Sequence, residues 1–258
     1  MFTLANLFTS ANLISGIIAV ILAVMGRLDL AAYAIFSGAV FDFLDGFIAR
    51  ITKTTGELGK QLDSLADMIT FGVAPGVVMM VVLTIDIESI GFISPHFIKN
   101  GFDLWFEGLF DGRLSLIPFA GLIIPFFSLF RLAKFNIDIR QSESFIGVPT
   151  PANTLLFMTF PLVLNSIQDV TSVHEVLFSP YLLVLLMIVM GLLMVSEIPL
   201  FSLKFKRFSF KGNEIRFTFL LISLIFILVF KVWSIALIVF LYLIFSIVEN
   251  TFFKKEVR

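Results

Sequence analysis

The chain has 258 residues, of which 59% are hydrophobic and 14% are charged. Ordinary globular proteins have about 45–50% apolar and about 25% charged residues. A soluble fold of this size has too little interior to bury so many apolar side chains, because its surface must face water. The mean hydropathy of +1.03 agrees with this reasoning. The composition therefore indicates an integral membrane protein.

The charge and the cysteine content exclude several functions. The formal net charge is −1, so no overall basic field attracts nucleic acid, and we expect no nucleic-acid partner. The chain contains no Cys, which rules out disulfides, thiol catalysis, iron–sulfur clusters and thiolate zinc sites. The chemistry must come from other side chains.

Long apolar runs without strict alternation favour helices over the strands of a membrane barrel. A membrane-spanning helix needs about 20 mostly apolar residues. The sequence therefore predicts an all-α integral membrane protein with about eight transmembrane helices. They are expected at about residues 4–26, 30–50, 64–84, 114–135, 151–168, 178–198, 216–231 and 232–250.

The loops predict an orientation. The segments 50–63, 131–150 and 199–216 and the C-terminal tail lie on one predicted side and hold fourteen of the 18 Lys and Arg residues. Cytoplasmic loops carry the excess of Lys and Arg, so both termini are predicted to be cytoplasmic. Within these segments, the basic stretch Lys204–Lys211 is interpreted as an anchor on anionic lipid. On the other side, segment 85–113 contains a Trp and several Phe beside acidic residues, which predicts a short helix in the outer headgroup region.

Four aspartates lie near the cytoplasmic ends of the second and third predicted helices: Asp42, Asp45, Asp63 and Asp67. A charge at the centre of a membrane helix costs about 2.5–3.5 kcal/mol, so the four carboxylates need compensation even near the interface. The spacings i, i+3 and i, i+4 place each pair on one helix face. Carboxylate oxygens without His or Cys suit Mg²⁺ or Mn²⁺. We therefore expect a metal site. Two alternatives are solvated helix caps and the ion pathway of a transporter.

Small and basic residues surround these aspartates. Gly46 and Gly59 leave room for a ligand to approach the backbone, and Ala49 keeps the same face shallow. Either glycine can instead serve helix packing. Arg50 offers a guanidinium fork that fits phosphate oxygens. Carboxylates that suit metals, a phosphate-binding arginine and glycine-lined space together suggest a nucleotide diphosphate as ligand.

The stretch from Asp42 to Asp67 resembles the signature of the CDP-alcohol phosphotransferases, D-x2-D-G-x2-A-R-x8-G-x3-D-x3-D, with every fixed position present. The resemblance implies a six-helix catalytic core within residues 1–200. Residues 201–258 would then form a basic cytoplasmic loop, a C-terminal helix pair and a short basic tail. Members of this family are commonly homodimers, so the resemblance implies a homodimer here. We expect the protein in the inner membrane of the cell.

Three further stretches, residues 63–75, 130–136 and 146–151, resemble the serine-transferring members of that family. The resemblance implies transfer of the phosphatidyl group from CDP-diacylglycerol to L-serine, giving phosphatidylserine and CMP. One position departs from the pattern, because Gly56 stands where relatives often carry Ser or Thr. The signature specifies the donor and leaves the acceptor open, so glycerol 3-phosphate and inositol phosphate remain alternatives. Outside enzymes, the alternative is an ion-coupled transporter.

The resemblance also assigns roles to residues. Cytidine would lie against Gly46, Ala49 and Gly59, and Arg50 would bind a phosphate oxygen. Metal ions would be held by the aspartates at positions 42, 45 and 63, with Asp67 sharing one and acting as the general base. The serine carboxylate needs a cationic partner, for which Arg131 is the candidate on the same membrane side.

Overall fold

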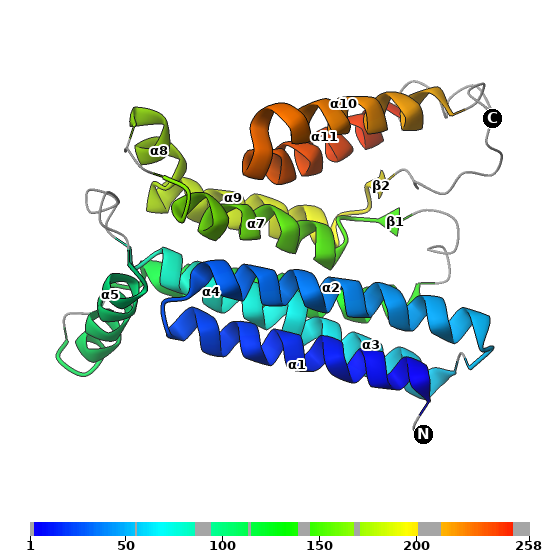
Figure 1. Cartoon of the computed structure of the whole chain (residues 1–258), viewed down its shortest axis with the longest axis horizontal. Coiled ribbons are helices and arrows are strands. Elements are labelled where there is room, and N and C mark those ends of the chain that lie inside the picture. The colour runs from blue at the N-terminus through cyan, green and yellow to red at the C-terminus, as the bar shows by residue number, and fades with distance from the viewer. Residues whose placement is uncertain are drawn as a thin grey trace.

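The computed structural model describes residues 3–54, 56–85, 94–112, 115–138, 145–167, 171–200 and 213–249. Within these ranges the protein is helical apart from connecting loops and two very short strands (Figure 1). Most of the long helices run along the longest axis of the molecule, and α5 lies across one end. The predicted all-α architecture is confirmed.

The N-terminal part of the chain forms a bundle in which α1 packs along α2 and also contacts the third helical run. That run consists of α3, a π-helical segment η1 and α4. The elements are α1 (Leu4–Val24), α2 (Leu28–Ile51), α3 (Glu57–Asp67), η1 (Met68–Val73) and α4 (Ala74–Val82).

The third helical run begins earlier than the sequence predicts. It starts at Glu57, whereas the predicted span starts at about residue 64. Hydropathy detects only the apolar part of a helix, but the polar residues of α3 continue the same helix and pack against α1. Asp63 and Asp67 therefore lie inside a helix, and the loop between α2 and α3 is only residues 52–56.

The middle of the chain contains a short helix at one end and then two core helices. Ser94 caps α5 by accepting a hydrogen bond from the backbone of Phe97 at 3.2 Å, which confirms the short helix predicted in segment 85–113. The elements are α5 (Pro95–Gly108), the 3-10 helix η3 (Ile117–Leu122), α6 (Ile123–Ile137), β1 (Phe145–Ile146) and α7 (Thr150–Leu164).

The C-terminal part adds a helix across the core and then a helical hairpin. Strand β1 pairs antiparallel with β2, so the segment before α7 is tied to the segment after α9. The elements are α8 (Ser172–Leu177), α9 (Pro180–Val195), β2 (Pro199–Leu200), α10 (Glu214–Phe230), the 3-10 turn η5 (Lys231–Trp233) and α11 (Ser234–Val248).

Each of the eight apolar segments predicted from the sequence contains a helix. Four helical runs of 21 to 26 residues are long and apolar enough to cross a membrane, and the run Glu214–Val248 of 35 residues is a fifth. That fifth run reverses at Lys231, where the backbone φ is 48°, so α10 and α11 lie side by side as predicted. Helices α7 and α9 are shorter, and the number of membrane crossings stays a prediction.

Helix α7 forms the centre of the core. Its residues from Leu156 to Leu164 are all buried, and Phe157 and Met158 have no exposed surface. Other helices approach closely where glycines meet: a Cβ on Gly121 would lie 2.4 Å from the carbonyl oxygen of Gly76. Helix α11 packs against α7, so the C-terminal hairpin covers the core.

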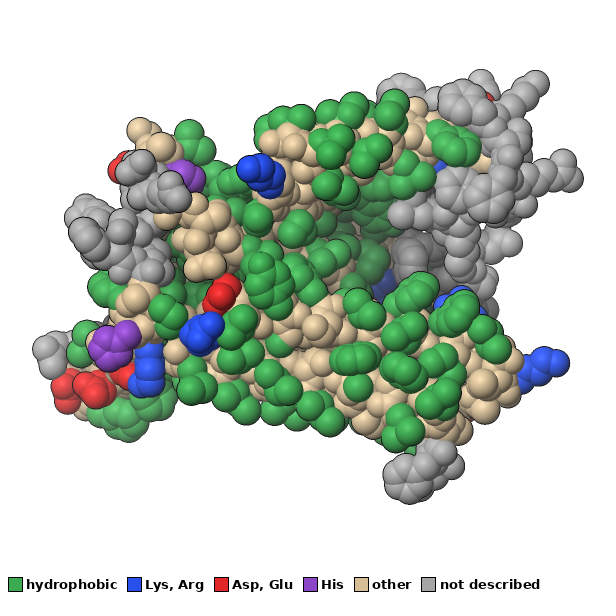
Figure 2. Space-filling view, in the orientation of Figure 1, with side chains coloured by type: hydrophobic (Ala, Val, Ile, Leu, Met, Phe, Trp, Pro, Cys, Tyr) green, Lys and Arg blue, Asp and Glu red, His purple; other side chains and the backbone are tan. Residues whose placement is uncertain are grey.

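The surface agrees with a membrane protein. In Figure 2 hydrophobic side chains cover the middle of the visible face, and charged side chains gather toward the two ends of the long axis. The first turn of α1, the last turn of α11 and the loop between α2 and α3 lie at the same end (Figure 1). The orientation of that end toward the cytoplasm stays a prediction, as does the division of the chain near residue 200. The basic stretch Lys204–Lys211 lies outside the described residues.

Candidate active site at a carboxylate cluster

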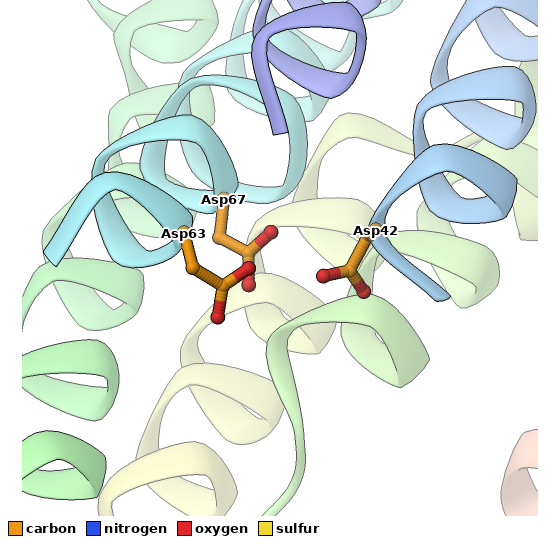
Figure 3. Close-up of side chains that lie close together, drawn as sticks. All are labelled: Asp42, Asp63 and Asp67. Carbon is orange, nitrogen blue, oxygen red and sulfur yellow. The ribbon is translucent and has the colours of Figure 1, made fainter. Parts of the chain in front are cut away.

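Three of the four signature aspartates converge between α2 and α3. One oxygen from each of Asp42, Asp63 and Asp67 lies within 4.8 Å of the others. Figure 3 shows Asp63 and Asp67 projecting from one helix toward the space faced by Asp42 from the other. The one-turn spacing of Asp63 and Asp67 puts both on one face of α3, and that face lies opposite Asp42 of α2.

Asp45 lies beside the cluster, outside the group of three. It follows Asp42 by three residues, which turns its side chain by about 60° around the helix. The residue is 5% exposed, and its Oδ2 has no hydrogen-bond partner among the described residues. A buried carboxylate oxygen without a donor is costly unless a cation compensates it.

The donor set fits a hard divalent cation. Like-charged carboxylates this close repel one another, and Oδ1 of Asp63 is also buried without a partner among the described residues. Carboxylate oxygens are the ligands that Mg²⁺ and Mn²⁺ prefer. The residues at positions 42, 63 and 67, with Asp45 adjacent, can hold such an ion.

A first cavity of about 200 Å³ opens on one side of the cluster. The three small residues predicted to contact the nucleotide line it, namely Gly46, Ala49 and Gly59. A Cβ on Gly46 or Gly59 would meet its nearest neighbour only at 3.7 Å. Protein packing therefore does not require glycine at either position, and the alternative reading of these two residues as helix-packing glycines is not supported.

Polar side chains that the sequence analysis did not single out also line this first cavity: Asn6, Thr9, Thr54 and Lys60. Thr54 lines the cavity two residues before Gly56, the position where relatives often carry a hydroxyl, and its own hydroxyl is hydrogen-bonded to that of Thr52 at 2.8 Å. Asn6 and Thr9 are polar residues within an apolar membrane helix, where such residues are expensive. That cost is the signal in the sequence by which they can be recognised.

A second cavity of about 360 Å³ lies on the other side of the cluster. It shares Asp45, Gly46 and Asp63 with the first cavity and is also lined by Asp42 and Asp67. Its remaining walls come from α2, the end of α6 and the start of α7: Phe43, Arg50, Arg131, Leu132, Phe135, Pro149, Thr150 and Pro151. The two cavities therefore adjoin at Asp45, Gly46 and Asp63, and Asp42 and Asp67 face the second cavity.

Arg131 is the buried cation of the second cavity. It is 3% exposed, its guanidinium lies 5.2 Å from the ring centroid of Phe135, and its Nε donates to the carbonyl oxygen of Val148 at 3.3 Å. Because its guanidinium carries a fork of N–H donors and it lines the second cavity, Arg131 can bind an anionic ligand there. Arg50, also predicted to bind phosphate, lines the same cavity and donates from Nε to the Gly46 carbonyl at 2.8 Å.

The carbonyl that holds Arg131 belongs to a strap, which we define as residues 145–149. Gly147 in this strap has a φ of 74°, and a Cβ there would lie 2.4 Å from the carbonyl oxygen of Met194. The Gly147 and Val148 amides donate to carbonyls of Ile198 and Leu193 at 2.8 and 3.1 Å. The strap is thus fixed to the end of α9, and its Val148 carbonyl is presented to Arg131.

Two other basic residues, one on α6 and one on α3, form hydrogen bonds with groups of the protein. Lys134 donates to Glu197 at 2.5 Å and to the Val195 carbonyl at 3.4 Å. Lys60 donates to the Asn136 carbonyl at 2.5 Å, and the Asn136 amide donates to Ser64 at 2.8 Å. These contacts tie α6 to α9 and to α3.

Sequence reasoning missed one residue in direct contact with the cluster. The amide Nδ2 of Asn12 donates to Oδ1 of Asp67 at 3.0 Å across 55 positions of the chain. The helix that carries Asp67 continues into the π-helical segment η1, and such segments frequently occur at functional sites. Asn12 is a buried amide within an apolar span, which is the signal that can identify it.

The chain belongs to the CDP-alcohol phosphatidyltransferase family, which it matches over residues 2–197. It is therefore a membrane-embedded transferase acting on a CDP-linked donor. It is similar to the CDP-diacylglycerol–serine O-phosphatidyltransferase of Helicobacter pylori, with 29% identity over 259 residues that span 100% of this chain and 94% of that protein.

Two further relatives carry the same name. The protein of Methanocaldococcus jannaschii is 30% identical over 197 residues, which span 76% of this chain and 72% of that protein. The protein of Bacillus subtilis is 28% identical over 161 residues, which span 62% of this chain and 76% of that protein. These matches extend the similarity beyond the signature.

Proposed function

We propose that this protein transfers the phosphatidyl group of CDP-diacylglycerol to the hydroxyl of L-serine, giving phosphatidylserine and CMP. The observation that carries the proposal is the pair of cavities that meet at the carboxylate cluster, one lined by glycines and the other holding a buried arginine. The names of the three relatives support the same donor and acceptor.

The first cavity is assigned to the cytidine nucleotide. Gly46 and Gly59 leave open space in which a base or ribose can approach the backbone, and Ala49 widens the same wall. The hydroxyl of Thr54 and the amide of Asn6 supply hydrogen-bonding groups there. The acyl chains of the donor then extend from the site into lipid.

Metal ions are assigned to the carboxylates. Asp42, Asp63 and Asp67 would hold Mg²⁺ or Mn²⁺, with Asp45 beside them. Such an ion neutralises charge on phosphate oxygens and on a leaving phosphate. In its absence the buried carboxylates of this cluster repel one another, so the proposal makes the enzyme dependent on a divalent cation.

The reaction is one displacement at phosphorus. The serine hydroxyl oxygen forms a bond to the lipid-side phosphorus of the donor, and the bond from that phosphorus to the CMP oxygen breaks. The hydroxyl proton passes to Asp67, which belongs to the carboxylate cluster and lines the second cavity. Arg50, on the same cavity, binds a phosphate oxygen. An ordinary aspartate is a weak base, so its placement beside the acceptor matters.

The second cavity is assigned to serine. Its carboxylate pairs with Arg131, whose fork of N–H donors matches a carboxylate. The Val148 carbonyl of the strap accepts a hydrogen bond from Nε of this arginine and so fixes its position. Lys134 is a less suitable partner for the serine carboxylate, because its ammonium group already donates to Glu197.

A direct assay tests the proposal. Purified protein in mixed micelles receives CDP-diacylglycerol, Mn²⁺ or Mg²⁺ and labelled serine, and the products are separated. Labelled phosphatidylserine and CMP are the expected products, and chelation of the metal should stop their formation. Use of glycerol 3-phosphate or inositol phosphate in place of serine would contradict the acceptor.

In this proposal the site opens on the side of the protein that carries most of the Lys and Arg residues. That side is cytoplasmic, so serine reaches the site directly from the cytoplasm. The homodimer expected from the family resemblance stays a prediction.

A further inference from the structure

Asn12 is a buried amide in the middle of the interface between α1 and the helix of Asp67. It has no exposed surface, and burying an amide costs free energy unless hydrogen bonds compensate it. Its Nδ2 donates to Oδ1 of Asp67 at 3.0 Å. Its Oδ1 has no hydrogen-bond partner among the described residues. Among the described residues, the contact with Asp67 is therefore the hydrogen bond that compensates this side chain.

Small residues create the space that Asn12 occupies. A Cβ on Gly38 of α2 would lie 3.0 Å from Asn12 Oδ1 and 2.6 Å from Cγ2 of Thr70. A Cβ on Gly16, one turn further along α1, would lie 2.6 Å from Thr70 Oγ1. At these two positions any side chain would separate α1 and α2 from the segment that follows Asp67.

The main chain of Asn12 is held as well. Oγ1 of Thr70, in the π-helical segment η1, donates to the Asn12 carbonyl oxygen at 2.9 Å. Thr70 follows Asp67 by three residues, so one helix contacts Asn12 both at its carbonyl and at its amide. These two hydrogen bonds fix the distance and the rotation between α1 and the Asp67 carboxylate.

We propose that Asn12 is a positioning residue for Asp67. By donating to Oδ1, it fixes the plane of the carboxylate and leaves the second oxygen for the metal ion and the acceptor hydroxyl. This inference rests on the proposed function, in which Asp67 is the base. Groups that orient metal ligands from behind typically change metal affinity or activity by about 10–100-fold when they are removed.

The first test compares Asn12→Leu, which keeps the branched shape and the number of heavy atoms and removes the donor, with Ser15→Ala. Ser15 is a matched control because it is buried on the same helix, and among the described residues its hydroxyl donates to the Ala11 carbonyl of that helix, at 2.9 Å. With the alcohol that the wild type uses, kcat of Asn12→Leu should fall about 10–100-fold. The KM for CDP-diacylglycerol should stay within about twofold, and Ser15→Ala should resemble the wild type in both constants.

The second test measures Mn²⁺ binding by electron paramagnetic resonance, without turnover. Asn12→Leu should weaken Mn²⁺ binding in the wild-type background and have no further effect in Asp67→Asn. Should Asn12→Leu fail to fold, Asn12→Ser takes its place, because Ser fits the space and is too short to reach Asp67.

Two results overturn the inference. In the first, kcat of the Asn12 variant falls no more than that of Ser15→Ala. In the second, the thermal stability and the KM for CDP-diacylglycerol change together with kcat, which indicates a purely structural role. A wild type that uses no alcohol at all contradicts the proposed function instead, and the Mn²⁺ measurement then decides on Asn12: weaker binding supports the inference and equal binding overturns it.

Discussion

The two cavities that meet at the carboxylate cluster are built in different ways. The first is formed largely by residues 45–63, which follow one another along α2, a short loop and α3, with one wall from α1. The second adds residues from α6 and from the start of α7, as far along the chain as Pro151. The comparison teaches that the cavity proposed for the donor is encoded locally, whereas the cavity proposed for the acceptor depends on contacts between distant helices.

This difference suggests how a family of transferases can keep one donor and change the acceptor. A shared donor is served by a contiguous motif that can be kept whole. The proposed acceptor site depends on Arg131, whose position is fixed by the strap and by the end of α9. Changes in the second cavity are therefore expected to alter the acceptor without altering the nucleotide.

Asp67→Asn tests the carboxylate cluster, at which the two cavities meet, and should have the largest effect. Because Asp67 is proposed as the base, kcat should fall by about 10²–10⁴-fold, the usual contribution of general-base catalysis. Binding of CDP-diacylglycerol should largely persist. The measurement is turnover with labelled serine beside a binding assay. Asp103→Asn on the exposed helix α5 is the control, and retained activity in Asp67→Asn would exclude this residue as base.

Gly59→Val tests the first cavity. The Cβ has room, so the protein should fold, but the side chain fills space assigned to the nucleotide. A steric cost of about 1–3 kcal/mol would raise the KM for CDP-diacylglycerol about 5–150-fold. The KM for serine should change much less.

Gly16→Val is the matched comparison for Gly59→Val. Here a Cβ would lie 2.6 Å from Thr70 Oγ1, so the thermal unfolding midpoint should drop. Should Gly59→Val lower the unfolding midpoint as much as Gly16→Val and leave the KM unchanged, the nucleotide assignment of the first cavity fails.

Arg131→Lys tests the second cavity. The charge remains, but the fork that can bind both carboxylate oxygens is lost. Loss of one hydrogen bond to a charged group, about 1.5–3 kcal/mol, predicts a rise in the KM for serine of about 10–100-fold. The KM for CDP-diacylglycerol should be nearly constant. Lys134→Met serves as the control, and an equal rise in that variant would remove the special role of Arg131.

Gly147→Ala tests the strap behind Arg131 and should have the smallest effect on catalysis. A side chain at this φ costs about 1–2 kcal/mol, and the Cβ would also clash with the Met194 carbonyl. The KM for serine should rise by a smaller factor than in Arg131→Lys, with a lower unfolding midpoint. Gly112→Ala is the control, because Gly112 has a φ of 71° with no atom within 4 Å of the added Cβ. An unchanged KM in Gly147→Ala would separate the strap from the acceptor site.

Much of the fold was predictable because the solvent is the bilayer. Hydropathy alone located each apolar helix, and the pair α10 and α11 was separated at Lys231 as predicted. It failed at the start of the third helical run, because the polar residues from Glu57 onward form helix by packing on α1 rather than by entering lipid. Length and hydropathy also do not decide whether the shorter helices α7 and α9 cross the membrane.

The sequence likewise predicted one part of the candidate site and left another part open. The spacing of Asp42, Asp63 and Asp67 on two helices joined by a short loop was enough to predict that their carboxylates converge. The spacing did not reveal that Asp45 lies beside the group of three, since that depends on how α2 is rotated against its neighbours.

The sequence by itself determined that the protein lies in a lipid bilayer, where its helices are and which carboxylates cluster. These features follow from hydropathy and one-turn spacings, which are local properties of the chain. Only the tertiary structure decided that Gly46 and Gly59 face open space, whereas Gly16 and Gly38 are in tight contact. It alone showed that Asn12 contacts Asp67 and that the Val148 carbonyl accepts from Arg131. These contacts join helices that are far apart in sequence, and their geometry depends on helix rotation and distance, which small residues at the interfaces set.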